Sequence, residues 1–218
     1  MKKLLAFILL SLSFVLLFGC AKKQEPQPTP AIIIPTIPTP VPTPTESVIP
    51  KENEMFFNTP AVAPQEVYIV ITKSKKTLEL YGDGTLFARF PIRLGEQPVG
   101  TKEKEGDQKT PEGEYYICTR KDKDTENTLF MGLSYPNQVD AQRGLDNKVI
   151  DKEKHDSIVK AINRKERPTW SSALGGAIGI HGKYDDREFT QGCIAVSDTN
   201  VQIIWDYTKM GTKVTILP

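Results

Sequence analysis

Two side chains in the C-terminal part of the chain could carry out nucleophilic chemistry: His181 and Cys193, twelve positions apart (193 − 181). An imidazole within hydrogen-bond reach of a thiol can take up its proton and leave a thiolate, the stronger nucleophile. Gly182 directly follows the histidine and Gly192 directly precedes the cysteine, so main chain can approach a substrate closely at both places. The pattern predicts a cysteine enzyme with Cys193 as nucleophile and His181 as general base and acid.

Such an enzyme also needs hydrogen-bond donors for the oxyanion that forms during attack. We expect the main-chain amides of Gly192 and Cys193 to provide them, together with the side-chain amide of Gln191. The plainer interpretation treats the cysteine as a small buried hydrophobic residue and the histidine as a satisfied polar one. The flanking glycines favour the catalytic interpretation.

Short apolar runs are expected to position these residues. Residues 177–180 and 194–196 are typical of buried strands, and the polar residues 183–191 connect them. Further strands are predicted at residues 67–71, 77–81, 86–94, 115–119 and 213–217, and helices at residues 151–167 and 197–208. We therefore expect a mainly β (α+β) fold, a single sandwich or barrel domain with flanking helices.

These motifs resemble a known family. Residues 180–182 (IHG) and 190–194 (TQGCI) are similar to the active-site signature of the L,D-transpeptidase catalytic domain, the YkuD-type cysteine enzymes of bacterial cell walls. Residues 109–115 (KTPEGEY) resemble the family's TPxGxY strand opening, and residues 133–137 (LSYPN) and 192–196 (GCIAV) resemble its YafK-like branch. The resemblance extends over residues 67–217.

The resemblance implies acyl transfer through a Cys193 thioester, with peptidoglycan stem peptides as substrate and an amine or water as acceptor. It also implies that a backbone carbonyl near Gly182 orients the His181 ring, and that Gly182, Thr190 and the Tyr135 hydroxyl contact substrate. No cofactor or metal is expected, because one histidine and one cysteine cannot fill a tetrahedral zinc site.

Two positions depart from the commonest family pattern: Gln191 stands where histidine is usual, and Ala195 where arginine is usual. The spacing from His181 to Cys193 is also shorter than in most members. Three functions therefore stay open: an L,D-transpeptidase, an L,D-carboxypeptidase or amidase-type hydrolase of the same fold, and a catalytically inactive, tethered peptidoglycan-binding module.

Other candidate residues have plainer explanations. Lys183, Arg187 and Arg143 are candidates to receive the carboxylates of the stem peptide, although each also fits a surface charge. Cys118 is expected to be structural. His155 lies on the charged side of its predicted helix and is expected to be solvated.

The N-terminus indicates export. Two lysines precede an apolar run over residues 4–18, too short to cross a bilayer of ~30 Å at ~1.5 Å per residue, so residues 1–19 are predicted to be a secretory signal. Residues 17–20 (LFGC) resemble a bacterial lipobox, which makes Cys20 the predicted lipidation site; an ordinary signal peptide is the alternative. The protein is thus expected to be anchored to a membrane by lipid, facing the cell wall or periplasm.

A proline-rich segment separates this signal from the predicted domain. Eleven of the 17 prolines fall within residues 26–64, a density that favours extended polyproline II over a packed core. We predict a disordered tether over residues 20–65 and one catalytic domain over residues 66–218. The net charge of +1, without a basic run, argues against a nucleic-acid partner, and we expect a monomer.

Overall fold

The computed structural model describes residues 54–122, 129–186 and 188–218. All of them belong to the second of two compact units, which comprise residues 1–47 and 48–218. The predicted signal, Cys20 and most of the predicted tether lie outside the described residues. Within the described part of the chain, none of the helices has the length and apolar character needed to span a membrane.

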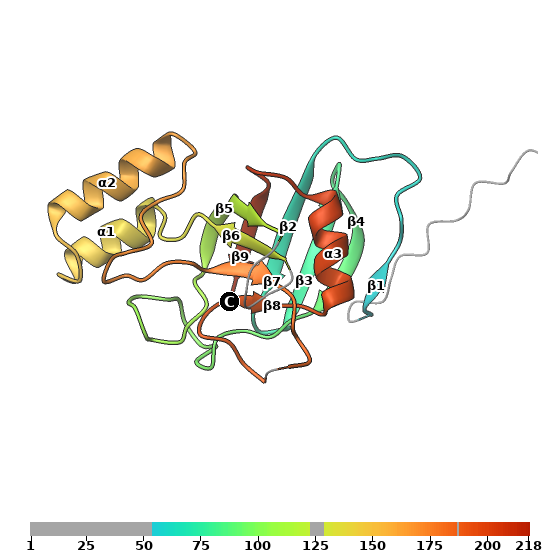
Figure 1. Ribbon diagram of the computed structural model, residues 1–218, viewed down its shortest axis with the longest axis horizontal. Coiled ribbons are helices and arrows are strands. Elements are labelled where there is room, and N and C mark those ends of the chain that lie inside the picture. The colour runs from blue at the N-terminus through green and yellow to red at the C-terminus, as the bar shows by residue number, and fades with distance from the viewer. Residues whose placement is uncertain (1–53, 123–128, 187) are drawn as a thin grey trace, which may run out of the picture. The chain divides into compact units, whose positions relative to one another are not determined.

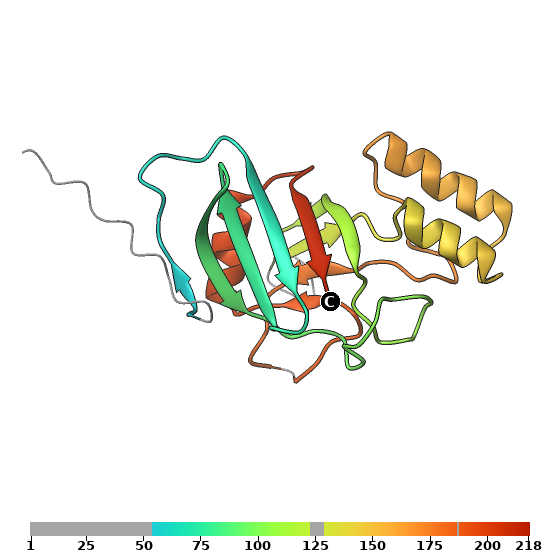
Figure 2. The ribbon, with the colours of Figure 1, turned by 180° about the vertical axis from the view of Figure 1, so that it is seen from behind.

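The described residues form one sheet of nine strands (Figures 1 and 2), in the order β1-β4-β3-β2-β9-β5-β6-β7-β8. Only the pairs β2–β9 and β7–β8 are parallel, and the other neighbours are antiparallel. The strands are β1 (Phe56–Phe57), β2 (Val67–Thr72), β3 (Thr77–Gly82), β4 (Thr85–Pro91), β5 (Gly113–Lys121), β6 (Phe130–Leu133), β7 (Gly179–His181), β8 (Ile194–Ala195) and β9 (Lys213–Leu217).

The two ends of this sheet meet. The chain that continues from β4 pairs Arg93 with Ala195 of β8, although β4 and β8 lie near opposite ends of the strand order. Ile92 and Leu94 on either side of Arg93 belong to the core, so the sheet curls around one apolar interior. Helix α3 (Asp198–Tyr207), capped by Ser197, adds Val201 and Ile204 to that core. The mainly β class with flanking helices is confirmed.

A helical hairpin is inserted between β6 and β7 (Figure 1). It consists of α1 (Gln138–Asp146) and α2 (Lys152–Asn163), which share a second, smaller core containing Ile158 and Leu174. The prediction of two helices was therefore incomplete: α1 was missed, and α2 ends before the predicted residue 167. Asn137, the last residue of the LSYPN motif, is the N-cap of α1 and forms a capping box with Asp140.

A short segment that precedes residue 66 also packs against the sheet. Strand β1 pairs with β4, and the Phe57 ring packs edge-on against Phe87 and Tyr207 at centroid distances of 6.5 and 5.9 Å. The Arg89 guanidinium donates to the Glu54 carbonyl at 3.2 Å. These contacts anchor residues 54–57, which precede the predicted boundary at residue 66, to the sheet.

Candidate active site

His181 ends strand β7 on the face opposite the core. Ile178 and Ile180 point into the apolar interior, so the alternation of the strand sends the His181 side chain to the other face. In the sheet register His181 pairs with Phe130 of β6 on one side and with Ala195 of β8 on the other. The imidazole is only 3% exposed, which limits its freedom to reorient.

One hydrogen bond defines the tautomer of this imidazole. His181 Nδ1 lies 2.7 Å from the Gly182 carbonyl oxygen, and a carbonyl can only accept. Nδ1 must therefore carry the proton, which leaves the lone pair of the neutral ring on Nε2. This is the backbone carbonyl near Gly182 that the resemblance implies.

Cys193 directly precedes strand β8 and is partly exposed. It lies two positions before Ala195, the strand partner of His181, and residues two apart in a strand share a face. The thiol and the imidazole therefore extend from the same face of neighbouring strands. The Cys193 Sγ lies 3.5 Å from the Ala177 carbonyl, to which the thiol can donate.

Thr190 braces the turn that precedes Cys193. Its buried hydroxyl donates to the Cys193 carbonyl at 2.7 Å and accepts from the Gly192 amide at 3.1 Å. This geometry corrects two expectations. The Gly192 amide is engaged within the turn rather than directed at an oxyanion, and the Thr190 hydroxyl is used by main chain rather than by a substrate.

Gly192 is required here for its size and conformation. Its φ is +127°, a region that side-chain-bearing residues rarely adopt, and a Cβ would lie 2.7 Å from the Lys109 carbonyl oxygen. The close approach brings residues 95–110, here called the 95–110 loop, against the turn. The Glu96 amide donates to the Thr190 carbonyl at 3.1 Å, and the Gly95 amide donates to the Thr110 hydroxyl at 3.0 Å.

A buried lysine holds the base of the 95–110 loop. Lys73 Nζ donates to the carbonyls of Gly100 at 2.6 Å and Thr110 at 3.0 Å, and to a Glu112 carboxylate oxygen at 2.7 Å. Its side chain is 2% exposed, so its ammonium group exchanges hydration for these three acceptors. One side of the candidate site is thus fixed by Lys73, in the turn that directly follows β2.

A second ion pair closes the loop itself. Lys102 Nζ lies 2.7 Å from Asp107 Oδ1, and the amides of Glu103 and Lys104 donate to Oδ2 of the same carboxylate at 2.7 and 3.0 Å. Partial burial disfavours the charged carboxylate, but these hydrogen bonds outweigh it and lower the pKa of Asp107.

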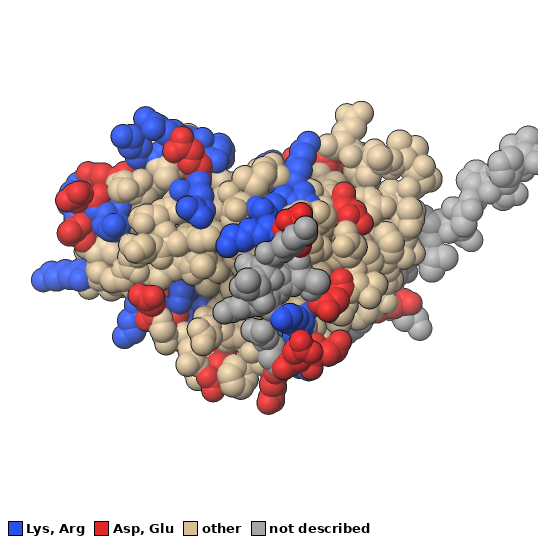
Figure 3. Space-filling view, in the orientation of Figure 1, with Lys and Arg blue, Asp and Glu red and all other residues tan. Residues whose placement is uncertain are grey.

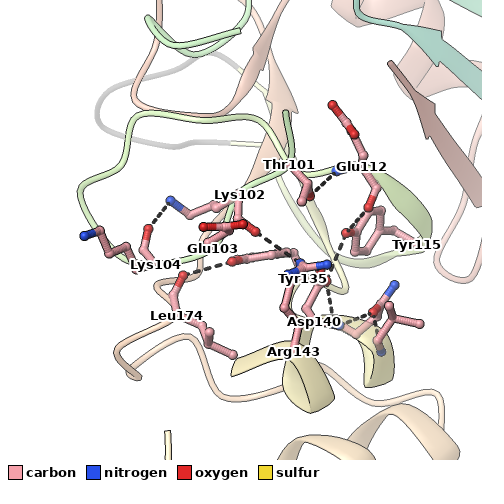
Figure 4. A network of polar contacts seen from close by, with 12 residues as sticks. Thr101, Lys102, Glu103, Lys104, Glu112, Tyr115, Tyr135, Asp140, Arg143 and Leu174 are labelled. Carbon is pink, nitrogen blue, oxygen red and sulfur yellow. Dashed lines mark hydrogen bonds and ion pairs between the residues drawn. The ribbon is translucent and has the colours of Figure 1, made fainter. Parts of the chain in front are cut away.

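The Tyr135 side chain lies in the interior of the domain. The Tyr135 side chain is fully buried, and its hydroxyl donates to the Leu174 carbonyl at 3.0 Å (Figure 4). Burial also raises its pKa, which keeps the hydroxyl protonated. The expected substrate contact of this hydroxyl is therefore wrong, because the group lies inside the domain beside α1.

Arg143 has an internal role as well. Its guanidinium donates to Asp140 Oδ1 at 2.5 Å and to the Lys102 carbonyl at 3.2 Å, while the Tyr115 hydroxyl donates to Asp140 Oδ2 at 2.9 Å (Figure 4). These contacts join the helical hairpin to the 95–110 loop and leave Arg143 a poor candidate for binding stem carboxylates.

The remaining predicted residues divide by location. Gln191 is exposed beside Cys193, and Lys183, half-buried, donates from its amide to Asp198 at 2.9 Å. Arg187 lies outside the described residues. Cys118 is buried in β5. It forms no disulfide with Cys193, and burial raises the pKa of its thiol to about 12.

Sequence reasoning missed the two sides of the site face. On one side Phe130 lies opposite His181 and packs edge-on with Trp170, at a centroid distance of 6.4 Å. On the other side Arg93 lies opposite Ala195. The alternation of Ile92, Arg93 and Leu94 could have indicated an outward-facing charge, but only the fold shows which strand it faces.

The match to a family model identifies the class of this protein. Residues 66–216 match the model described as YkuD, L,D-transpeptidase catalytic domain, and the chain belongs to this family. Its members are cell-wall enzymes of the L,D-transpeptidase type. None of the curated proteins matches the chain.

Solved structures similar to this chain include three from bacteria. They are Bd1075 of Bdellovibrio bacteriovorus (18% identity, TM-score 0.47, 76% of this chain and 52% of that one), the helical cell shape determining protein Pgp2 of Campylobacter jejuni (22%, 0.46, 69% and 47%) and an L,D-transpeptidase of Xylanimonas cellulosilytica (18%, 0.39, 74% and 64%). The chain thus spans about half the length of the first two.

Proposed function

We propose that this protein is a cell-wall L,D-transpeptidase that acts on peptidoglycan stem peptides through a thioester on Cys193. The observation that carries the proposal is the bond from His181 Nδ1 to the Gly182 carbonyl, because it leaves the basic Nε2 for proton transfer. The strand register supports it, since Cys193 extends from the same face as His181.

The proposed reaction has two half-reactions. His181 Nε2 takes the thiol proton, and the thiolate attacks the carbonyl carbon between the diamino acid and the following D-alanine. The C–N bond breaks as His181 returns the proton to the leaving amine, which leaves an acyl group on sulfur. An acceptor amine then attacks the thioester and gives up a proton to His181, and the Cys193 thiolate leaves and takes that proton back.

The oxyanion donors in this proposal differ from those first expected. Because Thr190 engages the Gly192 amide, we assign the stabilisation to the Cys193 amide and to the side chain of Gln191, which is exposed beside it. Gln191→Ala should lower kcat with little change in KM, since these contacts strengthen only as the oxyanion forms.

Product analysis tests the reaction and separates it from its alternatives. The purified protein is incubated with a disaccharide-tetrapeptide, and the products are identified by mass spectrometry. Cross-linked dimers support the transpeptidase, and loss of D-alanine without cross-linking indicates the hydrolase of the same fold, in which water replaces the amine. Turnover should vanish in Cys193→Ala and persist in Cys118→Ala, whereas no turnover in the parent would indicate the inactive binding module.

We also propose that the mature chain is anchored to a membrane through lipid on Cys20 and tethered by the proline-rich segment. The lipobox-like residues 17–20 support this proposal. Cells that express the full chain are fed a labelled fatty-acid analogue and fractionated. The parent should carry label in the membrane fraction, and Cys20→Ala should lose both; equal labelling of the two would contradict the anchor.

A further inference from the structure

Arg93 lies in the same row of side chains as His181. The Arg93 amide donates to the Ala195 carbonyl at 2.9 Å, and the Ala195 amide donates to the Arg93 carbonyl at 3.0 Å. Paired residues in a sheet project from the same face, and Ala195 is in turn the partner of His181. Arg93, Ala195 and His181 therefore follow one another across the site face.

The middle position of this row is nearly empty of side chain. Ala195 contributes one methyl group, whereas the strands on either side carry an arginine and a histidine. Two strand spacings separate the outer residues, roughly 10 Å between their backbones. Ala195 itself is fully buried, and Arg93 and His181 extend from the same face on either side of it.

An aromatic ring holds the guanidinium without neutralising it. Arg93 Cζ lies 4.3 Å from the centroid of the Tyr184 ring, and the Tyr184 amide donates to the Val196 carbonyl at 3.1 Å, which fixes the segment that carries this ring. Stacking engages the face of a guanidinium and leaves its N–H groups pointing outward in the plane. The contact therefore orients Arg93 and leaves its donors directed at the surroundings.

The donors of Arg93 lack a protein carboxylate. Its Nε is buried and has no hydrogen-bond partner, and among the described residues no acidic side chain forms an ion pair with it. Arg89, four positions earlier in β4, shows the usual solution, with its Nε 2.7 Å from Glu79. A buried donor without a partner is costly, and a ligand carboxylate would satisfy it.

We propose that Arg93 binds the carboxylate of the residue that leaves during acyl transfer, which is the terminal residue of the stem peptide. This inference rests on the proposed function, in which His181 protonates the leaving amine. In an amino acid the amine and the carboxylate are attached to one carbon. A leaving residue bound between Arg93 and His181 would therefore place its amine toward the imidazole and its carboxylate toward the Arg93 fork, which matches a carboxylate in a bidentate manner.

Acidic residues near the site oppose the attraction between Arg93 and a ligand carboxylate. Asp185, Asp186 and Glu188 are exposed on the segment between β7 and β8, and Figure 3 shows carboxylates gathered along the lower edge of the face on which that segment lies. These charges are in solvent, where salt screens them beyond about 8–10 Å. The Arg93 guanidinium is partly buried and contacts its ligand directly, so we expect its local effect to prevail.

The first test compares two substrates that differ only in this carboxylate. A tetrapeptide stem with a free terminal carboxylate and its C-terminal amide are assayed with the parent, Arg93→Gln, Arg93→Lys and Arg164→Gln. The parent should prefer the free acid by about 10- to 100-fold in kcat/KM, chiefly through KM, as expected for a charged hydrogen bond. Arg93→Gln should lower kcat/KM for the free acid to the value for the amide, and should leave kcat/KM for the amide unchanged.

The other two variants refine this result. Arg93→Lys keeps the charge but not the planar fork, and should recover only part of the preference. Arg164→Gln removes an exposed arginine at the end of α2 and should behave as the parent. If Arg93→Gln lowers kcat/KM equally for both substrates, or for neither, the proposal is overturned.

A second test needs no turnover and therefore separates this inference from the proposed function. Rates of Cys193 alkylation are measured with iodoacetate, an anion, and iodoacetamide, its neutral analogue. Arg93→Gln should lower the ratio of the two rates at least threefold, and Arg164→Gln should leave it unchanged. If the parent turns over neither stem peptide yet the ratio falls as expected, the proposed function fails and the anion site stands; an unchanged ratio in folded Arg93→Gln refutes the site.

Discussion

The turn of residues 190–193 should lose much of its function when one hydroxyl is removed. Thr190→Val keeps the shape of the side chain but removes the acceptor of the Gly192 amide at 3.1 Å and the donor to the Cys193 carbonyl at 2.7 Å. Thr190 is 4% exposed, so water cannot easily replace the hydroxyl. We expect the backbone around the nucleophile to lose its fixed position.

The size of the effect follows from these two bonds. An unsatisfied buried group costs about 1–3 kcal/mol, and the Cys193 end of the turn is partly exposed, so the free energy of unfolding should fall by about 2–4 kcal/mol. For a domain of this size that corresponds to a fall in Tm of roughly 5–15 °C. Turnover should fall about 10- to 100-fold through kcat, because misplaced reacting atoms lower the rate while substrate contacts remain.

Calorimetry and steady-state kinetics measure the two effects, with Thr190→Ser as the matched control. Serine keeps the hydroxyl and loses only a methyl group, so Thr190→Ser should retain most of the turnover and lose about 1 kcal/mol or less. Equal Tm and equal kcat for the valine and serine variants would refute the bracing role of the hydroxyl.

Three further predictions concern the loop and the thiols. Lys73→Met leaves the Glu112 carboxylate and two carbonyls without their donor and should lower the unfolding free energy by about 3–5 kcal/mol in urea titrations, whereas the exposed Lys209→Met should match the parent. The lowered pKa of Asp107 implies stabilisation that is present above about pH 4 and lost as the pH falls through the folded pKa. The difference in unfolding free energy between the parent and Asp107→Asn, measured in urea, should therefore narrow in acid. A difference that widens in acid would contradict this reasoning. Because burial raises the pKa of Cys118 to about 12, iodoacetamide at neutral pH should label Cys193 at least tenfold faster in the folded protein, and preferential labelling of Cys118 by peptide mapping would contradict this.

The sequence predicted those features that depend on local pattern. Apolar alternation and turn residues located β2, β3, β5 and β9, and the IHG and TQGCI motifs lie where the neighbouring strands β7 and β8 form. Helix α1 was missed because its sequence, QVDAQRGLD, contains only two large apolar residues, Val139 and Leu145, and its hydrophobic contacts come from α2 and Leu174. The capping-box residues Asn137 and Asp140 were the local signal that could have indicated it.

The errors within the site have a different origin. Several partners could have bonded the same polar group, and the sequence does not show which of them lies within reach in the fold. The Gly192 amide could have faced a substrate, but it donates its hydrogen bond to the Thr190 hydroxyl. The Tyr135 hydroxyl was taken by Leu174, 39 residues later, a partner that no short motif reveals. Arg93 looked like an ordinary alternating charge until the fold paired it with Ala195.

The pairing of Arg93 with Ala195 joins positions 102 residues apart (195 − 93), so the sheet can close only after the chain between them has been synthesised and has folded. Contacts of such long range form late, because the entropy of closing the intervening chain must be overcome first. The base and the sulfur consequently come together at the same stage as the last strands. An unfolded chain would therefore carry an ordinary, weakly reactive thiol, and any activation of that thiol by His181 would arise only when folding is complete.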